Sequence, residues 1–146
     1  MHPALSVIIF TTFSGMGYGL FIWLCGSLIG GSPPDDTQII SGAVLSIIFV
    51  GTGLLSSTLH LGHPERAWRA FSQWRSSWLS REGILSILTF GPMVFIGGEK
   101  YFSLGMEFLI LPMAILGLLG AIATVFTTSM IYASLKAIPA WHNVWV

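Results

Sequence analysis

Apolar residues fill four long stretches of the chain, and the charged residues are confined to the gaps between them. No Asp, Glu, Lys or Arg occurs before Asp35, nor within 37–64, 83–98 or 108–135. About 20 apolar residues cross the hydrocarbon core of a bilayer as an α-helix, so only the third stretch is short. That stretch reaches across if its helix begins near Leu79. The pattern predicts four transmembrane helices, at about 5–31, 38–61, 79–98 and 106–133.

Turn-forming residues separate these stretches. Gly30 and Gly31 end the first helix, Asp36 or Thr37 can cap the second, and the glycine pair 97–98 ends the third. The first stretch lacks the basic start of a signal peptide and is too long for one, so we take it as a helix. None of the four stretches shows the ten-residue alternation of barrel strands. The expected fold is therefore an all-α membrane protein, a single domain over 1–146 with four transmembrane helices in an up-down bundle.

The composition agrees with a membrane protein and narrows its chemistry. Hydrophobic residues make up 53% of the chain and charged residues 8%, whereas a soluble domain carries charge on about a quarter of its positions. Six basic and six acidic residues balance, which gives no reason to expect a nucleic-acid partner. Cys25 is the only cysteine, so an internal disulfide and cysteine-only metal sites are excluded. We predict no bound metal.

The charged loop over 62–80 carries more than a connector needs. Pro64 suits the first position of a helix, and four aromatic residues then fall in one sector of a helical wheel: Trp68, Phe71, Trp74 and Trp78. Aromatic side chains in such a pattern settle at the headgroup level of a membrane. The pattern predicts an interfacial helix over 63–78, between the second and third spans, with a basic face open to an acidic partner subunit.

An even number of spans puts both ends of the chain and this loop on the same side of the membrane, here called side A. Side A holds five of the six basic residues: Arg66, Arg69, Arg75, Arg81 and Lys136. The opposite side, side B, holds only Lys100. The positive-inside rule therefore predicts that side A is cytoplasmic.

Polar side chains and glycines gather in the half of the bundle nearest side A. They recur at helical spacing in all four spans: Thr11, Gly15, Tyr18 and Gly19; Gly53, Ser56, Ser57 and His60; Glu82, Ser86 and Thr89; Thr124, Thr127, Thr128 and Tyr132. Polar groups inside lipid usually face protein or a cavity. Close helix packing accounts for the small and hydroxyl residues, as in the spacing Gly15-xxx-Gly19.

Packing alone does not account for His60 and Glu82, which flank the loop at similar depth. A titratable pair inside a membrane is a functional-site candidate by default, and an imidazole beside a carboxyl can exchange a proton near neutral pH. The natural ligand of such a pocket is a lipid-soluble molecule that gives up protons, which suggests a quinol. The alternative is an ion pair that locks the hairpin. Bis-histidine haem is disfavoured, because only His60 is well placed as an axial ligand.

Two segments closely resemble the membrane anchor subunit of bacterial dimethyl sulfoxide reductase. The first is STLHLGHPERAW over 57–68, followed by LSRE over 79–82, and the second is IYAS over 131–134 with IPAW over 138–141. The resemblance covers the whole sequence. That family is about twice as long and has eight helices, so these 146 residues match its N-terminal half, as a fragment, a truncated gene or a split subunit.

The resemblance implies an anchor without haem or metal, in the bacterial inner membrane, that oxidises menaquinol. It also implies two partners, a four-cluster iron–sulfur subunit that takes the electrons and a molybdopterin subunit that reduces dimethyl sulfoxide or a similar oxide. The family histidine tied to quinol oxidation falls on His60, and the corresponding glutamate falls on Glu82. Arg66 would lie near the quinol head or the iron–sulfur subunit.

One mechanism is expected from these residues. His60 takes a proton from the quinol, Glu82 passes it to side A, Arg66 stabilises the developing negative charge, and Ser57 lines the quinol site. Two rival functions stay open. One is a structural anchor or assembly subunit, and the other is a small proton-coupled carrier, although carriers are usually built from repeats and none is evident here.

Overall fold

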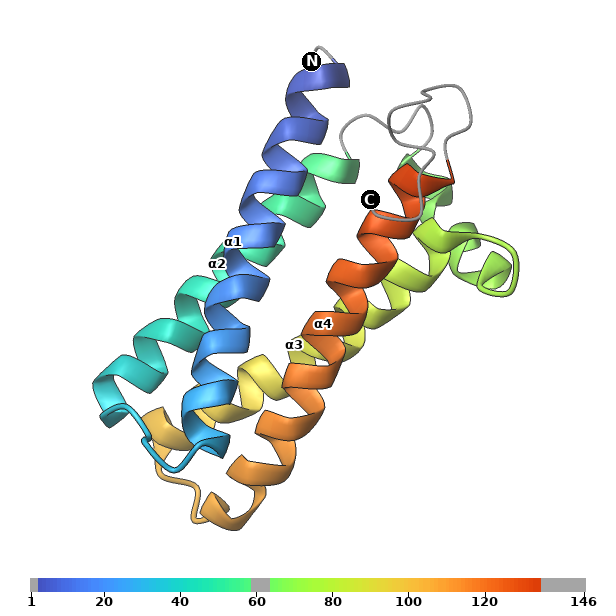
Figure 1. Ribbon diagram of the computed structural model, residues 1–146. Helices are drawn as coiled ribbons and strands as arrows, with labels where there is room; N and C mark the ends of the chain where they lie inside the picture. Colours follow the sequence, from blue (N-terminus) through green and yellow to red (C-terminus); the bar gives the residue numbers. More distant parts are fainter. Residues whose placement is uncertain (1–2, 59–63, 135–146) are drawn as a thin grey trace.

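The computed structural model describes residues 3–58 and 64–134, which are entirely helical apart from their connections (Figure 1). The elements in sequence order are α1 (Pro3–Ile29), α2 (Asp36–Thr58), η1 (Pro64–Gln73), α3 (Trp78–Phe102), η2 (Glu107–Leu109) and α4 (Ile110–Ala133). No strand occurs in these ranges. The four α-helices are long and apolar enough to cross a membrane. The predicted all-α fold with four transmembrane helices is confirmed.

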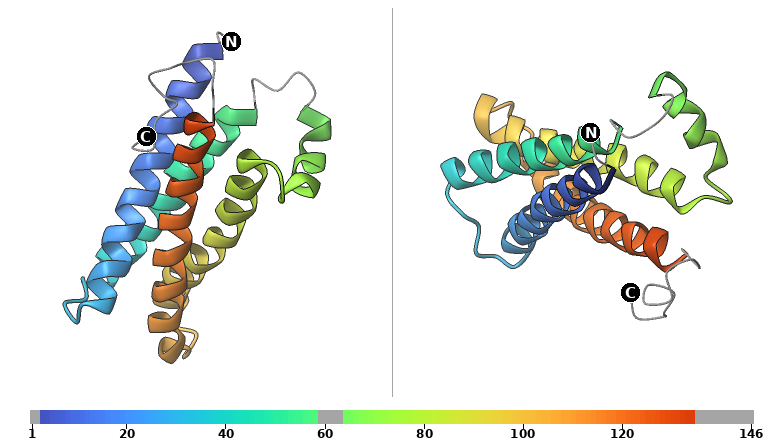
Figure 2. Two further views of the ribbon diagram at one scale, coloured as in Figure 1. Left: turned by 45° about the vertical axis from the view of Figure 1, so that its right-hand side comes forward. Right: turned by 90° about the horizontal axis from the view of Figure 1, so that it is seen from above.

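The four long helices run alternately up and down and pack as a ring. α1 packs chiefly on α2 and α3 on α4, while the pairs α1–α4 and α2–α3 close the ring. Figure 2 shows this arrangement from the side and from above. The start of α1, the end of α2, the start of α3 and the end of α4 share one end of the bundle, at the top of Figure 1. That end is side A.

The cap of the second helix differs from the sequence prediction. Asp35, rather than Asp36 or Thr37, holds the helix start: its Oδ1 accepts the Gln38 backbone N–H at 2.8 Å. The Gln38 side chain returns a bond, because its Oε1 accepts the Asp35 backbone N–H at 3.2 Å. This reciprocal pair is a capping box, which satisfies two backbone donors at once.

The third helix does not end at its glycine pair, so that prediction is wrong. It continues through Gly97 and Gly98 to Phe102 and stops where Ser103 adopts a left-handed conformation with φ 50°. The reason is packing: a Cβ added at Gly97 would lie 2.9 Å from the Ala43 Cβ, so this glycine lets α3 approach α2 closely. At about 1.5 Å per residue, the 25 residues reach roughly 37 Å, enough to span the bilayer.

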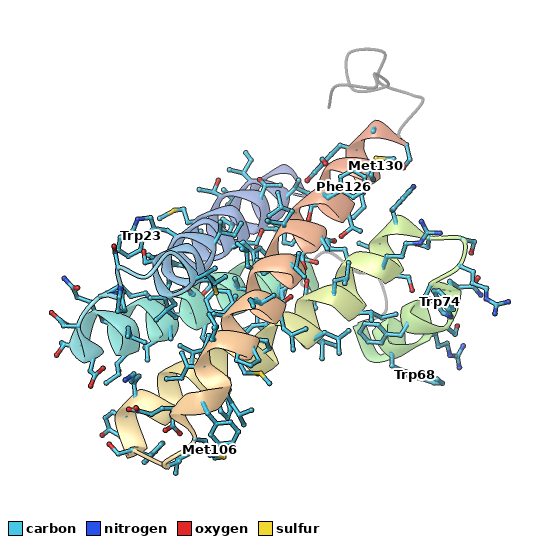
Figure 3. The ribbon with its side chains drawn as sticks, turned by 60° about the horizontal axis from the view of Figure 1, so that its bottom comes forward. Trp23, Trp68, Trp74, Met106, Phe126 and Met130 are labelled. Carbon is cyan, nitrogen blue, oxygen red and sulfur yellow. The ribbon has the colours of Figure 1, made fainter. Side chains whose placement is uncertain are left out.

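The helix between the second and third spans is shorter than the predicted 63–78. Only Pro64–Gln73 form a helix, of the 3₁₀ type, and Trp78 is instead the first residue of α3. The backbone turns between them because Ser77 caps α3 and the Arg81 guanidinium donates to the carbonyls of Trp74 and Arg75, at 2.9 and 2.7 Å. The side chains of Trp68, on η1, and Trp74, on the turn after it, are exposed on the outer side of this segment (Figure 3). Its position at the membrane interface stays a prediction.

Glycine brings α1 and α2 together, but not through the predicted Gly15-xxx-Gly19 spacing. A Cβ added at Gly15 or Gly19 would meet nothing within 4 Å. The close approach is instead at Gly17, where an added Cβ would lie 2.6 Å from Val50 Cγ2 and 2.9 Å from the Ser46 carbonyl oxygen. Small residues let membrane helices pack backbone to backbone. Here that contact lies on a different face of α1 from the predicted pair.

Replacing Gly17 by alanine should therefore destabilise the bundle by about 1–3 kcal/mol, because the methyl group pushes α1 away from α2. The matched control is Gly19→Ala on the same helix, where the added methyl has room and alanine is the better helix former. Unfolding in mixed micelles, followed by circular dichroism, measures both. Equal stability of the two variants would contradict the close contact at Gly17.

Candidate functional site

Glu82 is a carboxyl group enclosed by the side A half of the bundle. It lies in the second turn of α3 and is 4% exposed. The Thr128 hydroxyl of α4 donates to its Oε1. The same hydroxyl lies 3.0 Å from the Thr124 carbonyl oxygen of its own helix. A hydroxyl can donate one hydrogen bond and accept others, so Thr128 is able to relay a proton to or from the carboxyl.

A side-chain hydrogen bond between two helices, such as that of Thr128 to Glu82, is uncommon among the described residues. Most buried hydroxyls bond a carbonyl one turn earlier in their own helix, as Ser14, Ser46 and Thr124 do. Besides the Thr128–Glu82 bond, the hydroxyl of Ser56 on α2 reaches across to the Ser6 carbonyl of α1 at 3.1 Å. The glutamate is thus held by a partner that only the tertiary structure supplies.

A second polar layer lies one turn deeper. Tyr18 of α1, Ser86 of α3 and Thr124 of α4 meet there, and all three are buried. Among the described residues, neither the Tyr18 hydroxyl nor the Ser86 hydroxyl completes a hydrogen bond. Buried polar groups are nearly always bonded, so these two hydroxyls, which lie near each other and near Thr124, are candidates to bond a further group.

A groove of about 240 Å³ runs along this region between α1 and α4. Each wall is a helical stripe with the spacing i, i+3, i+4 and i+7: Thr11, Ser14, Gly15 and Tyr18 on α1, and Val125, Thr128, Ser129 and Tyr132 on α4. Because the helices are antiparallel, Tyr132 stands at the side A end and Tyr18 at the deep end. Thr128 lines the groove and also bonds Glu82, so it connects the two.

An apolar layer closes this polar region toward side B. Phe21, Leu24, Met93 and Ile96 fill the middle of the bundle and are fully buried. The other buried glutamate of α3, Glu99, lies beyond that layer, where its Oε1 accepts the Met106 backbone N–H at 2.9 Å.

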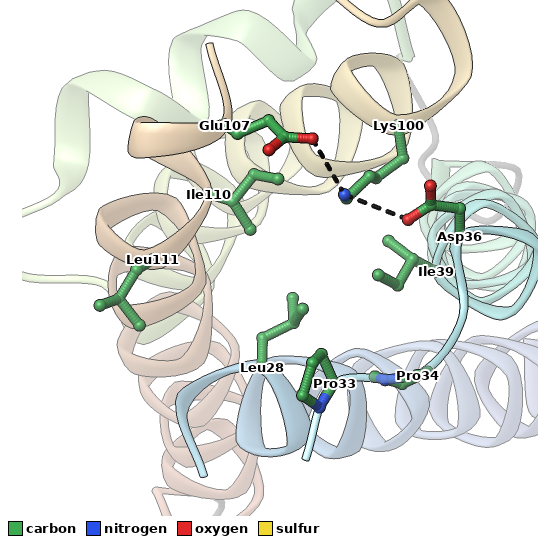
Figure 4. Close-up of a pocket in the computed structure, with 9 residues that line it drawn as sticks. All are labelled: Leu28, Pro33, Pro34, Asp36, Ile39, Lys100, Glu107, Ile110 and Leu111. Atoms are coloured by element: carbon green, nitrogen blue, oxygen red, sulfur yellow. Dashed lines mark hydrogen bonds and ion pairs between the residues drawn. The ribbon is translucent and has the colours of Figure 1, made fainter. Parts of the chain in front are cut away.

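The side B end carries a separate cavity of about 320 Å³ (Figure 4). Lys100 projects into it and forms ion pairs with Asp36 at 3.1 Å and with Glu107 at 3.4 Å. These three residues come from the end of α3, the start of α2 and the turn before α4. One ammonium group is thus shared by two carboxylates, and the cluster ties these helix ends together.

Two of the four predicted site residues, Glu82 and Ser57, have side chains that the structure describes. Glu82 is buried as expected, and Ser57 is half-buried near the end of α2. His60 lies outside the described residues, and so does the side chain of Arg66, although its backbone belongs to η1. The pairing of His60 with Glu82, and the roles of Arg66 and Ser57, stay predictions. Arg81, next to Glu82 in sequence, points instead to the loop, with its guanidinium 4.2 Å from the Trp78 ring.

Sequence reasoning placed Tyr18, Thr128 and Tyr132 on polar lines but gave them no role in the site. A signal was present in the matched stripes of α1 and α4, each of which ends in a tyrosine. What the sequence did not show is that these stripes face each other. Groups of three or more metal-ligating side chains are absent from the described part of the molecule.

Comparison with known proteins gives the family of this chain. A family model described as "DMSO reductase anchor subunit (DmsC)" matches residues 1–146. A sulfite dehydrogenase subunit from Allochromatium vinosum is 37% identical, over 98% of this sequence and 49% of that protein. A subunit of the anaerobic dimethyl sulfoxide reductase of Escherichia coli is 28% identical, over 95% of this sequence and 49% of that protein.

The chain spans about half the length of these curated relatives. No solved structure matches it. The four helices able to span a membrane agree with the family model, which covers every residue. The protein is a multi-pass membrane protein, and it belongs to the DMSO reductase anchor subunit family.

Proposed function

We propose that this chain forms the quinol-oxidising part of a membrane anchor, which passes electrons from menaquinol to an iron–sulfur subunit. The observation that carries the proposal is the Glu82 carboxyl, enclosed at the side A end of the bundle, bonded by Thr128 and adjoining a groove. An ionisable group inside a membrane is costly in free energy, so it is retained chiefly where it has a function.

The chemistry requires a base next to the quinol. Oxidation of a quinol to a quinone releases two electrons and two protons, and loss of an electron makes the hydroxyl proton strongly acidic. A positioned base that takes this proton lowers the barrier. In this proposal His60 is the first acceptor and Glu82 passes the proton to side A. Arg66 stabilises the negative charge, and Ser57 lines the site.

The proposed partners follow from the family. The relative from Escherichia coli is named as part of dimethyl sulfoxide reductase, so a four-cluster iron–sulfur subunit and a molybdopterin catalytic subunit are the expected acceptors of the electrons. They would dock at side A, where Arg69 of η1 and Arg75 of the following turn lie on the exposed surface. The expected location is the bacterial inner membrane.

A second candidate function reverses the direction. The relative from Allochromatium vinosum is named as part of sulfite dehydrogenase, and a dehydrogenase removes electrons from its substrate. In such a complex the anchor would pass electrons to a quinone, and Glu82 would supply protons rather than take them. A hydrogen-bonded carboxyl serves either direction. Measuring which of quinol oxidation or quinone reduction the membrane complex catalyses distinguishes the two.

Glu82→Gln should lower quinol-driven turnover of the membrane complex about 10²-fold or more, because the amide cannot take up a proton. Reduction driven by an artificial dye, which bypasses the anchor, should be unchanged. The control is Glu99→Gln, a buried glutamate on the same helix beyond the apolar layer, whose bond to the Met106 N–H an amide oxygen can keep. Quinol turnover that survives Glu82→Gln would leave only a structural anchor.

His60→Ala should likewise abolish quinol-driven reduction and spare dye-driven reduction, because the first proton acceptor is removed. Membranes that contain the complete complex, assayed with a reduced naphthoquinone, give the measurement. If quinol turnover persists in this variant while Glu82→Gln loses it, the carboxyl acts without the imidazole and the assigned order of proton transfer is wrong.

A further inference from the structure

The groove between α1 and α4 has features of a binding site rather than of a packing defect. Hydroxyl groups come from six of its eight lining residues, which are Thr11, Ser14, Tyr18, Thr128, Ser129 and Tyr132. The other two, Gly15 and Val125, are exposed and open the groove sideways within the membrane-spanning part of α1 and α4. A small recess that offers hydroxyl groups between apolar walls and opens into the membrane suits a ligand with a polar ring and an apolar tail.

The Tyr18 hydroxyl supplies an independent indication of a ligand. Tyr18 lines the deep end of the groove and is 2% exposed, yet its hydroxyl completes no hydrogen bond with any described residue. A phenol can both donate and accept. The Ser86 and Thr124 hydroxyls lie nearby, but the Tyr18 hydroxyl completes a bond with neither of them. Leaving it unpaired inside the bundle costs free energy, which a bound oxygen atom would recover.

We propose that the groove between α1 and α4 holds the ring of the quinol, with Tyr18 bonded to one ring oxygen and Thr128 to the other. This inference rests on the proposed function and names its binding site. The volume of about 240 Å³ is below the roughly 300 Å³ at which pockets for whole drug-sized ligands begin. The groove therefore holds the ring but not the tail, and the isoprenoid tail extends between Gly15 and Val125 into the lipid.

The site gives the proton a defined route. As the quinol loses an electron to the iron–sulfur subunit, the O–H bond of one ring hydroxyl breaks and its proton passes to the Thr128 oxygen. Thr128 gives its own proton to Glu82 Oε1, so its hydroxyl is restored. Glu82 then releases this proton to side A. As the second electron leaves, the other ring hydroxyl gives its proton to His60, the first acceptor of the proposed function, and Glu82 passes that proton to side A as well. Two electrons and two protons depart, and a quinone remains.

Gly15 offers a direct test of where the ring binds. A larger residue there has room at its Cβ, because nothing lies within 4 Å of that position, and the rest of its side chain would occupy the groove that Gly15 lines. Gly19, one turn further along α1, is equally exposed and equally free of neighbours but does not line the groove. Gly15→Leu should therefore fill the site, whereas Gly19→Leu should leave it open.

The experiment measures binding of a short-tailed naphthoquinone with one isoprene unit to the membrane complex in nanodiscs, by calorimetry. We expect no detectable binding to Gly15→Leu and unchanged binding to Gly19→Leu. Tyr18→Phe should bind about 3- to 10-fold more weakly, the effect of one lost hydrogen bond. Thr128→Val should weaken binding by a similar factor and in addition lower the kcat of quinol-driven turnover, because it removes both a bond to the ring and the relay.

Each outcome decides the proposal. Unchanged binding to Gly15→Leu overturns the groove as the site, and so does equal weakening by Gly15→Leu and Gly19→Leu, which would indicate disturbed packing. If Gly15→Leu does not assemble, the affinity of Tyr18→Phe decides, and a wild-type affinity of that variant overturns the proposal.

The turnover of Glu82→Gln separates this inference from the proposed function. Loss of turnover in Glu82→Gln together with full binding to Gly15→Leu would support the proposed function and place its quinol site outside the groove. Full turnover in Glu82→Gln with no binding to Gly15→Leu would keep the groove and remove the relay.

Discussion

Inside a bilayer a polar side chain has no water to bond, so it must be satisfied by its own helix or by a neighbouring one. In this bundle most hydroxyl groups use their own helix, bonding a carbonyl one turn earlier. The carboxyl of Glu82 has no such local solution, because a carboxylate accepts and the helix backbone has no free donor there. Its partner, Thr128, comes from α4. Thr128 thus supplies from α4 the hydrogen bond that α3 cannot provide, and the same residue lines the groove.

Close packing on one face of α1 leaves another face available. Gly17 lets α1 lie against Val50 and Ser46 of α2, so the tight contact is made there. Gly15, two residues away and on a different side of the helix, touches nothing and lines the groove toward α4. Gly15 and Gly17 of α1 thus have opposite roles. Gly17 permits close contact with the backbone of α2, and Gly15 keeps the groove open.

The two ends of the bundle are chemically different. Toward side A there is a buried acid, two tyrosines and a groove, and toward side B there is an ion cluster around Lys100. The layer of Phe21, Leu24, Met93 and Ile96 separates them. Paired charges at side B fix the helix ends, whereas the acid at side A is held by a hydroxyl that can exchange protons. The proposed quinol site therefore lies in the side A half of the bundle, and the structural ion cluster lies at the side B end.

The sequence by itself determined the four spans, because the cost of burying charge in lipid confines Asp, Glu, Lys and Arg to the gaps. It also predicted a polar Glu82 near the side A end of the third span, where the structure shows it buried within the bundle. Helix ends were less predictable: Gly97 stays helical since contact with Ala43 outweighs the low helix propensity of glycine. Only the tertiary structure decided that Thr128 bonds Glu82 and that the stripes of Tyr18 and Tyr132 face one another. Helical periodicity gives the direction of a side chain around its own axis, but which neighbour it meets depends on how the helices are rotated and crossed, and that is set by packing across the whole bundle.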